Sequence, residues 1–303
     1  MPDDSRRIDA ATVAAIAVTL VLWASAFAGI KAGLEGYGPG ELALLRFGVA
    51  SVVLGAYAVV RRVPLPRAAD LPRLTLAGLL GITIYHVALN YGEVSVSAGA
   101  ASLIIAAGPV FTALMATLFL RERLSAWGWV GIVVSFAGVA LITLGEGEGG
   151  LHFEPGALLI MVSAIVTAAY FIVSKPLLVR YRPLHFTTYV IWAGTVPLLL
   201  WAPSLVRQMP AATPGQTAAV VYLGVFPAAL AYLTWSYALA RMPASVLSSF
   251  LYLSPVLAIA IAFVWIGEVP SLISLLGGTI AVAGVAMVSA RGRLSDPGTG
   301  VAE

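Results

Sequence analysis

The chain has 303 residues, of which 60% are apolar and 10% are charged, and its formal net charge at pH 7 is +3. Ordinary globular proteins are about 45–50% apolar and about 25% charged, so this composition excludes a water-soluble domain and indicates a protein surrounded mostly by lipid. The small net charge excludes a nucleic-acid partner. Because the chain has no cysteine, disulfides and thiolate metal ligands are excluded as well.

Ten apolar segments follow one another along the chain, and each is long enough to cross a bilayer, which takes roughly 20 residues. Their ranges are 11–33, 41–60, 73–93, 98–120, 126–145, 156–178, 185–204, 216–240, 244–266 and 270–290. The two-residue alternation of a transmembrane barrel is absent. The sequence therefore predicts an all-α integral membrane protein with ten transmembrane helices.

The basic residues predict the orientation of these helices. With the N-terminus in the cytoplasm, 14 of the 17 Lys and Arg residues fall in cytoplasmic segments: Arg6, Arg7, Arg61, Arg62, Arg67, Arg73, Arg121, Arg123, Lys175, Arg180, Arg182, Arg241, Arg291 and Arg293. Lys31 and Arg207 lie on the other side, and Arg46 lies within the second segment. Because short cytoplasmic loops are rich in Lys and Arg, we expect a multi-pass inner-membrane (plasma-membrane) protein with both termini in the cytoplasm.

The chain contains an internal repeat. A shift of 146 residues superimposes Tyr91 on Tyr237, Ser102 on Ser248, Pro109 on Pro255, Glu122 on Glu268 and Gly131 on Gly277. In the first segment, a shift of 144 matches Phe27 with Phe171 and Lys31 with Lys175. The two halves, 11–145 and 156–290, hold five predicted helices each, and an odd number gives the second half the opposite orientation. Inverted-topology repeats are typical of secondary transporters, which bind substrate between the repeats.

These matches also carry a family resemblance. The stretch PVFTALMATLFLRERL at 109–124, followed by Gly131 and the triplet at 137–139, resembles the signature of the EamA family within the drug/metabolite transporter superfamily. The second half resembles it again through Pro255, the Gly-Glu pair at 267–268, Gly277 and the triplet at 283–285. The resemblance spans residues 11–290. It implies ten helices in two EamA repeats and export or import of small metabolites, and it names no substrate.

Two prolines occupy matching places in the two halves. Pro109 and Pro255 fall at the midpoints of the fourth and ninth predicted helices, where a proline removes a backbone hydrogen bond and kinks a helix. Interrupted helices at matching positions point to a transport site, so we interpret both prolines as hinges. Toleration of proline in membrane helices is the alternative.

Polar residues mark one face of the third predicted helix. His86 and Asn90 are one helical turn apart, and the 146-residue shift places Tyr232 opposite His86. Such residues inside a membrane face a cavity or the bundle interior, or else join helices by hydrogen bonds. Aromatic residues near the middle of other helices fit a cavity lining or tight packing equally well. The candidate substrate-binding residues are Trp23, Tyr85, His86, Asn90, Tyr170, Tyr232, Trp235, Ser248 and Tyr252.

The Tyr85-His86 pair also resembles cavity-lining positions of amino-acid exporters in this family. Arg46 is expected to extend outward toward Glu35 or Glu41, in a structural role, and substrate binding is the alternative for this residue. The small residues Gly131, Ser135, Gly138, Gly277, Ala281 and Gly284 let the fifth and tenth helices approach closely, within the chain or in a homodimer.

The sequence therefore predicts a secondary transporter that exports small neutral or zwitterionic metabolites such as amino acids. An importer or another carrier of this fold is one alternative, and a membrane enzyme acting on lipid through His86 with Ser102 or Ser248 is the other. The P-loop, HExxH and GxSxG motifs are absent, so we expect no enzyme, no cofactor and no metal. The expected partners are a small-molecule substrate and the bilayer. Every Asp and Glu falls in a tail, a loop or near a predicted helix end, so transport is facilitative or its proton dependence passes through His86.

Overall fold

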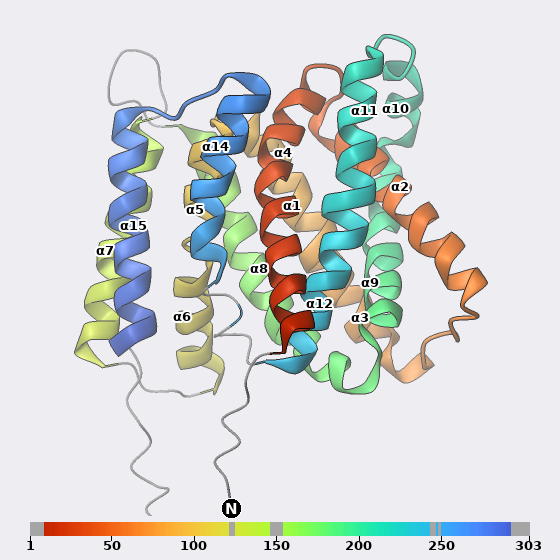
Figure 1. Ribbon diagram of the computed structural model, residues 1–303, viewed down its shortest axis with the longest axis horizontal. Helices are drawn as coiled ribbons and strands as arrows, with labels where there is room; N and C mark the ends of the chain where they lie inside the picture. Colours follow the sequence, from red (N-terminus) through yellow and green to blue (C-terminus); the bar gives the residue numbers. More distant parts are fainter. Residues whose placement is uncertain (1–8, 121–124, 146–153, 243–246, 248–249, 292–303) are drawn as a thin grey trace, which may run out of the picture.

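The computed structural model of the chain describes residues 9–120, 125–145, 154–242, 247 and 250–291. Over these residues the secondary structure is helical, with no strand, and the helices stand side by side in one bundle (Figure 1). The predicted all-α fold class is thereby confirmed. The predicted site residue Ser248 lies outside the described residues.

Both halves of the chain contribute helices to the bundle. The first half contributes α1 (Ala10–Leu34), α2 (Pro39–Val60), α3 (Leu71–Gly78), α4 (Tyr85–Glu93), α5 (Ala98–Ile105), α6 (Gly108–Leu120) and α7 (Ala126–Gly145). The second half contributes α8 (Pro155–Arg180), α9 (Pro183–Leu198), α10 (Ala202–Gln208), α11 (Pro214–Leu223), α12 (Ala231–Arg241), α14 (Ser254–Ile266) and α15 (Leu272–Arg291). Between them lie the 3-10 turns η1 (Ala68–Asp70), η3 (Leu199–Trp201) and η5 (Phe250–Leu253), and the π-helices η2 (Leu79–Ile84) and η4 (Gly224–Leu230).

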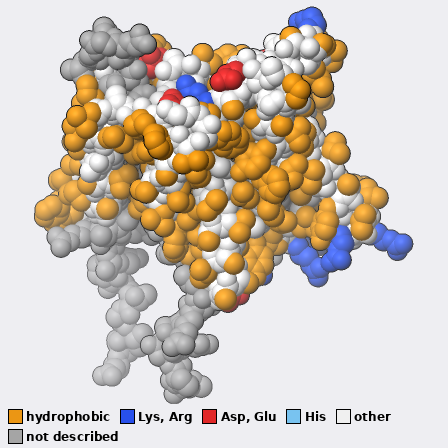
Figure 2. Space-filling model, turned by 45° about the horizontal axis from the view of Figure 1, so that its top comes forward, with side chains coloured by type: hydrophobic (Ala, Val, Ile, Leu, Met, Phe, Trp, Pro, Cys, Tyr) orange, Lys and Arg blue, Asp and Glu red, His pale blue; other side chains and the backbone are white. Residues whose placement is uncertain are grey.

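The described helices suit a bilayer. Seven helical stretches are long and apolar enough to cross it: Ala10–Leu34, Pro39–Val60, Ala68–Glu93, Ala126–Leu144, Pro155–Arg180, Pro183–Gln208 and Pro214–Arg241. Large apolar side chains such as Val59, Leu200 and Val264 stay mostly exposed, and hydrophobic side chains cover most of the surface in Figure 2. Such a large exposed apolar surface indicates membrane embedding. Shorter apolar helices cover Ala98–Thr112, Phe250–Ile266 and Leu272–Val288.

Local sequence explains where several helices begin. Proline is the first residue of α2, α8, α9 and α11, where its missing N–H would have no partner within the helix in any case. At the start of α1, the Asp9 carboxylate accepts a hydrogen bond from the Thr12 backbone N–H at 2.8 Å. These caps fix the helix ends from which the bundle is built.

The two mid-span prolines each follow a break in a helix. Helix α5 ends at Ile105 and α6 begins at Gly108, so Pro109 is the second residue of α6. Likewise, Pro255 is the second residue of α14, after the 3-10 turn η5. The residue before a proline disfavours helical backbone, and a proline is tolerated in the first turn of a helix. The predicted interruption is therefore present as a break instead of a kink in a continuous helix.

Helices α7 and α15 form a close pair at one edge of the bundle (Figure 1). A Cβ atom added to Gly138 would lie 2.3 Å from the Ala281 backbone nitrogen, and one added to Gly284 would lie 2.4 Å from that of Ser135. Only glycine allows backbones to approach so closely. The small residues predicted to pack in these helices thus meet each other within one chain.

Two π-helical segments interrupt the third and eighth predicted helices. The segment η2 joins α3 to α4, and η4, which contains Pro227, joins α11 to α12. Single π-helical turns are rare and occur frequently at functional sites, because they disturb the regular i to i−4 hydrogen bonding. Gly81 of η2 lines a cavity inside the bundle, and η4 contacts one of its lining residues, Trp23, through the Pro227 carbonyl oxygen.

Candidate functional site

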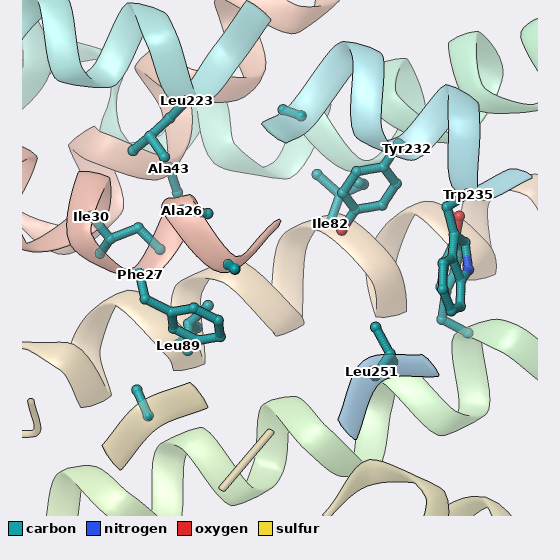
Figure 3. Close-up of a cluster of buried hydrophobic side chains, with 14 of the residues drawn as sticks. Ala26, Phe27, Ile30, Ala43, Ile82, Leu89, Leu223, Tyr232, Trp235 and Leu251 are labelled. Carbon is teal, nitrogen blue, oxygen red and sulfur yellow. The ribbon is translucent and has the colours of Figure 1, made fainter. Parts of the chain in front are cut away.

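A cavity with a volume of about 50 Å³ lies inside the bundle. A single water needs roughly 10–15 Å³, so the cavity has room for a few water molecules. Its aromatic walls are Trp23, Phe27, Tyr85, Tyr170, Phe171 and Tyr232, and its polar lining residues are Arg46, His86, Ser102, Thr167 and Ser254. Figure 3 shows part of the surrounding cluster, with Phe27 from α1, Leu89 from α4 and Trp235 from α12. Both halves of the chain therefore contribute to one enclosed site.

A line of hydrogen bonds crosses this site. The Tyr232 hydroxyl donates to the Gly81 carbonyl oxygen at 2.8 Å, and it lies 3.0 Å from His86 Nε2. Because the hydroxyl has one proton and gives it to the carbonyl, Nε2 carries a proton and donates to the hydroxyl oxygen. His86 Nδ1 then accepts from Arg46 Nη1 at 3.3 Å. The pattern assigns His86 as the neutral tautomer protonated at Nε2.

The π-helices supply backbone acceptors to the cavity residues. Gly81, which accepts from Tyr232, belongs to η2. In η4, the Pro227 carbonyl oxygen accepts from the indole nitrogen of Trp23 at 3.2 Å. Each aromatic donor comes from the opposite half of the chain, so the two halves are joined at the cavity by reciprocal hydrogen bonds. Figure 3 shows the Tyr232 ring beside Ile82, the neighbour of Gly81.

Aromatic rings pack against one another in and behind the lining of the cavity. The ring centroids of Trp23 and Trp235 are 4.9 Å apart, and those of Phe171 and Trp235 are 5.0 Å apart. Trp23 also meets Tyr232 edge to face, with centroids 5.4 Å apart. The ring of Tyr85 lies 4.5 Å from that of His86. Such rings present both apolar surface and the negative face of a π system, which attracts cations.

Five of the predicted site residues line the cavity together: Trp23, Tyr85, His86, Tyr170 and Tyr232. Trp235 does not line it, but it is 1% exposed and packs behind Trp23. Asn90 is fully buried away from the lining, where its Nδ2 donates to the Pro39 carbonyl oxygen at 2.9 Å and thereby joins α4 to α2. For Asn90, this contact therefore fits the second interpretation, in which a polar side chain joins helices by a hydrogen bond.

The remaining predicted residues lie beside the cavity. Tyr252 is half-buried and packs against the small apolar cluster that includes Val110 and Val285. Pro109 and Pro255 do not line the cavity, although Ser254, the neighbour of Pro255, does. Any influence of Tyr252, Pro109 and Pro255 on the site therefore passes through the helix breaks next to them.

Arg46 was expected to extend outward, and this expectation is wrong. Its side chain is 1% exposed and lines the cavity beside His86. Glu41, one of its two expected partners, instead accepts a hydrogen bond from the Ser204 hydroxyl. Arg46 lies two turns into α2, roughly 10 Å from the first residue of the helix, and it faces the bundle interior. Because Arg46 is this far from the helix start and faces the interior, its side chain does not reach the membrane surface.

Glu93 is a second residue that sequence reasoning missed. Its carboxylate is fully buried, and neither oxygen has a hydrogen-bond partner. It borders a more open hollow at the end of the bundle where α1 ends, together with Lys31 and Glu268, whose charged atoms are 4.0 Å apart. Its position at a predicted helix end concealed this burial.

Comparisons with known proteins agree with this arrangement. The profile of the EamA-like transporter family matches the chain twice, over residues 10–144 and 154–290. A protein of Streptantibioticus cattleyicolor named "Probable terminal-alkyne amino-acid exporter" is 43% identical over 278 residues, which cover 91% of this chain and 93% of that protein. The "Uncharacterized transporter YdfC" of Bacillus subtilis is 41% identical and covers 87% of this chain and 86% of its own length.

A solved crystal structure supports the fold. It superimposes with a TM-score of 0.65 and 24% identity, over 93% of this chain and 96% of the other. The "Uncharacterized inner membrane transporter YedA" of Escherichia coli K12 is 27% identical, over 89% of this chain and 87% of its own length. On the two profile matches and the similarity at more than 40% identity, the chain belongs to the EamA-like transporter family, within the drug/metabolite transporter superfamily.

Proposed function

We propose that this transporter is a secondary carrier that exports small neutral or zwitterionic metabolites, such as amino acids, through the central cavity. The observation that carries the proposal is the enclosed cavity itself, which combines one guanidinium with hydroxyl groups and an aromatic wall. Concave, mostly apolar sites with a few convergent polar groups are typical of small-molecule binding. The name of the Streptantibioticus relative supports amino acids as the substrate class.

The proposed architecture is ten transmembrane helices in two inverted five-helix repeats, residues 11–145 and 156–290. The π-helices support it, because a shift of 146 residues places η2 on η4 and Gly81 on Pro227. With the cation distribution, this architecture places both termini in the cytoplasm and the protein in the inner membrane. In Figure 1 α1 begins and α15 ends at the same end of the bundle, as this arrangement requires.

Two equivalent lysines support alternating access. At the proposed cytoplasmic end, Lys175 Nζ donates to the carbonyl oxygens of Leu239 and Met242 at the end of α12. The negative end of the helix dipole also stabilises a lysine at this position. At the outer end, its counterpart Lys31 lies beside an open hollow, near Glu268. We propose that this conformation is closed toward the cytoplasm by Lys175.

The enzyme alternative needs a serine close to a histidine base. Both ring nitrogens of His86 are instead engaged by Arg46 and Tyr232, and the hydroxyl of Ser102 donates to the Gly99 carbonyl oxygen at 2.6 Å. For the described pair, His86 and Ser102, these contacts favour transport over catalysis, and Ser248, the other serine of this alternative, lies outside the described residues. An importer would use the same cavity and differ in the direction of net flux.

The experiment is counterflow in proteoliposomes that contain the purified protein, with a panel of radiolabelled amino acids. We expect unlabelled internal amino acid to drive uptake of the same labelled compound, with no chemical conversion. Conversion of added lipid by the purified protein, without any exchange of label, would overturn the proposal in favour of an enzyme.

A further inference from the structure

The guanidinium of Arg46 is a buried charge without an ionic partner at contact distance. Among the described residues, ion pairs join Lys31 to Glu268 and Arg180 to Asp70. Arg46 contacts the neutral His86 ring through Nη1, and its Nε has no hydrogen-bond partner. The Phe47 ring, whose centroid is 5.3 Å from the guanidinium carbon, covers it from one side. A cation that is 1% exposed is thus in direct contact with the neutral groups of His86 and Phe47.

Such a charge is costly to bury, and proteins retain one where it is paired or used. Glu93, on the neighbouring helix α4, is a buried carboxylate that attracts Arg46 through space, but it forms no hydrogen bond with the guanidinium. The other charged residues that border the same hollow as Glu93 are Lys31, Glu35 and Glu268. Among the described residues, no carboxylate is therefore in contact with Arg46, and the guanidinium lines the cavity in which we place the ligand.

The donor set defines the missing partner. A guanidinium presents N–H groups in a planar fork that matches the two oxygens of a carboxylate, and Nε of Arg46 is free to form one arm of that fork. The lining also includes Trp23, Phe27 and Tyr170, which suit an apolar or unsaturated body and attract an ammonium group through their π faces. One cavity thus combines a donor for a carboxylate with aromatic surface for the rest of the ligand.

We infer that Arg46 binds the carboxylate of the transported substrate and makes this site selective for free amino acids over their amides, esters and decarboxylated amines. The inference deepens the proposed function and rests on it for the amino group. The carboxylate part stands alone, because it needs only an acid that fits the aromatic wall.

The test compares acids with matched amides as competitors for binding of radiolabelled leucine and, separately, of radiolabelled hexanoate to detergent-purified protein. Leucine is compared with leucinamide, and hexanoate with hexanamide, for wild type and Arg46→Gln. A charge-assisted bidentate contact is expected to make the wild type prefer leucine by about tenfold or more. Arg46→Gln should bring the ratio close to one, Arg46→Lys should retain part of it, and Arg207→Gln, which removes an exposed cation, should leave it unchanged.

Each outcome decides the inference. Equal competition by acid and amide in the wild type would overturn it without any variant, so a failure of Arg46→Gln to fold leaves it testable. A full acid preference in folded Arg46→Gln would overturn it as well. Preference for hexanoate over hexanamide, with no binding of leucine, would support the carboxylate site and overturn the amino-acid proposal instead.

Discussion

His86 Nε2 and the Tyr232 hydroxyl lie 3.0 Å apart, and the two residues are separated by 146 positions in the chain, the offset of the internal repeat. Residues related by a two-fold axis can touch only where that axis passes between them. If the two halves are inverted repeats, this hydrogen bond therefore marks the axis. Substrate sites of inverted-repeat transporters lie at this interface, and the cavity is lined by both residues.

The first prediction concerns this bond. Tyr232→Phe removes the hydroxyl and leaves both His86 Nε2–H and the Gly81 carbonyl oxygen without their partner. Leaving buried polar groups unpaired costs about 1–3 kcal/mol each, so we expect a lower melting temperature in detergent and weaker transport. Tyr57→Phe, at an exposed tyrosine, is the matched control. Equal melting temperatures for both variants would show that the bond is not formed.

A second prediction concerns the closed cytoplasmic end. Since the chain has no cysteine, Thr167→Cys places a single thiol in the cavity. Lys175→Gln should release the end of α12 and speed labelling of this thiol by an impermeant maleimide from the cytoplasmic side by several-fold. Lys175→Arg keeps N–H donors at this position, so the thiol should react more slowly in this variant than in Lys175→Gln. Identical rates in the two variants would contradict the proposed closure.

Energy coupling gives the third prediction. We expect either facilitative transport or a proton dependence that passes through His86. The test is uphill accumulation in proteoliposomes under an imposed pH gradient, for wild type, His86→Ala and Glu93→Gln. Accumulation that survives His86→Ala would contradict this expectation. Its loss in Glu93→Gln would then assign proton coupling to the buried, unpartnered Glu93 carboxylate.

The prolines give the fourth prediction. Pro109 and Pro255 each stand directly after a break in a helix. If the breaks act as hinges, Pro109→Ala and Pro255→Ala should lower the transport rate more than the yield of folded protein. Pro214→Ala, at the start of α11, is the control and should leave transport close to wild type. Unchanged transport in the double variant would mean that the prolines are merely tolerated.

Much of the fold was predictable from the sequence, because apolar length determines where helices form in a membrane protein. Helix starts at Pro39, Pro155 and Pro183 fall within two residues of the predicted segment starts. The π-helices were not predictable, since η2 and η4 have the same apolar composition as the helices around them. Their positions depend on packing between distant segments.

The site was predictable in its aromatic part and not in its charged part. Tyr85, His86 and Tyr232 were found because polar or amphipathic residues deep in a predicted helix need partners. Arg46 and Glu93 were misread because distance from a helix end is visible in the sequence, while the face that a helix turns inward is not. Asn90 was expected among the substrate-binding residues, but its side chain donates to the Pro39 backbone carbonyl oxygen. A backbone acceptor of this kind cannot be recognised in the sequence.

The most direct test of transport through the central cavity is counterflow of a radiolabelled amino acid by a variant with a filled cavity. Thr167→Trp introduces a large ring into the lining, and Leu200→Trp introduces the same ring at an exposed apolar position. We predict that wild type and Leu200→Trp exchange the label, and that Thr167→Trp, folded and reconstituted to the same level, does not. Equal exchange by Thr167→Trp and wild type would contradict the central claim.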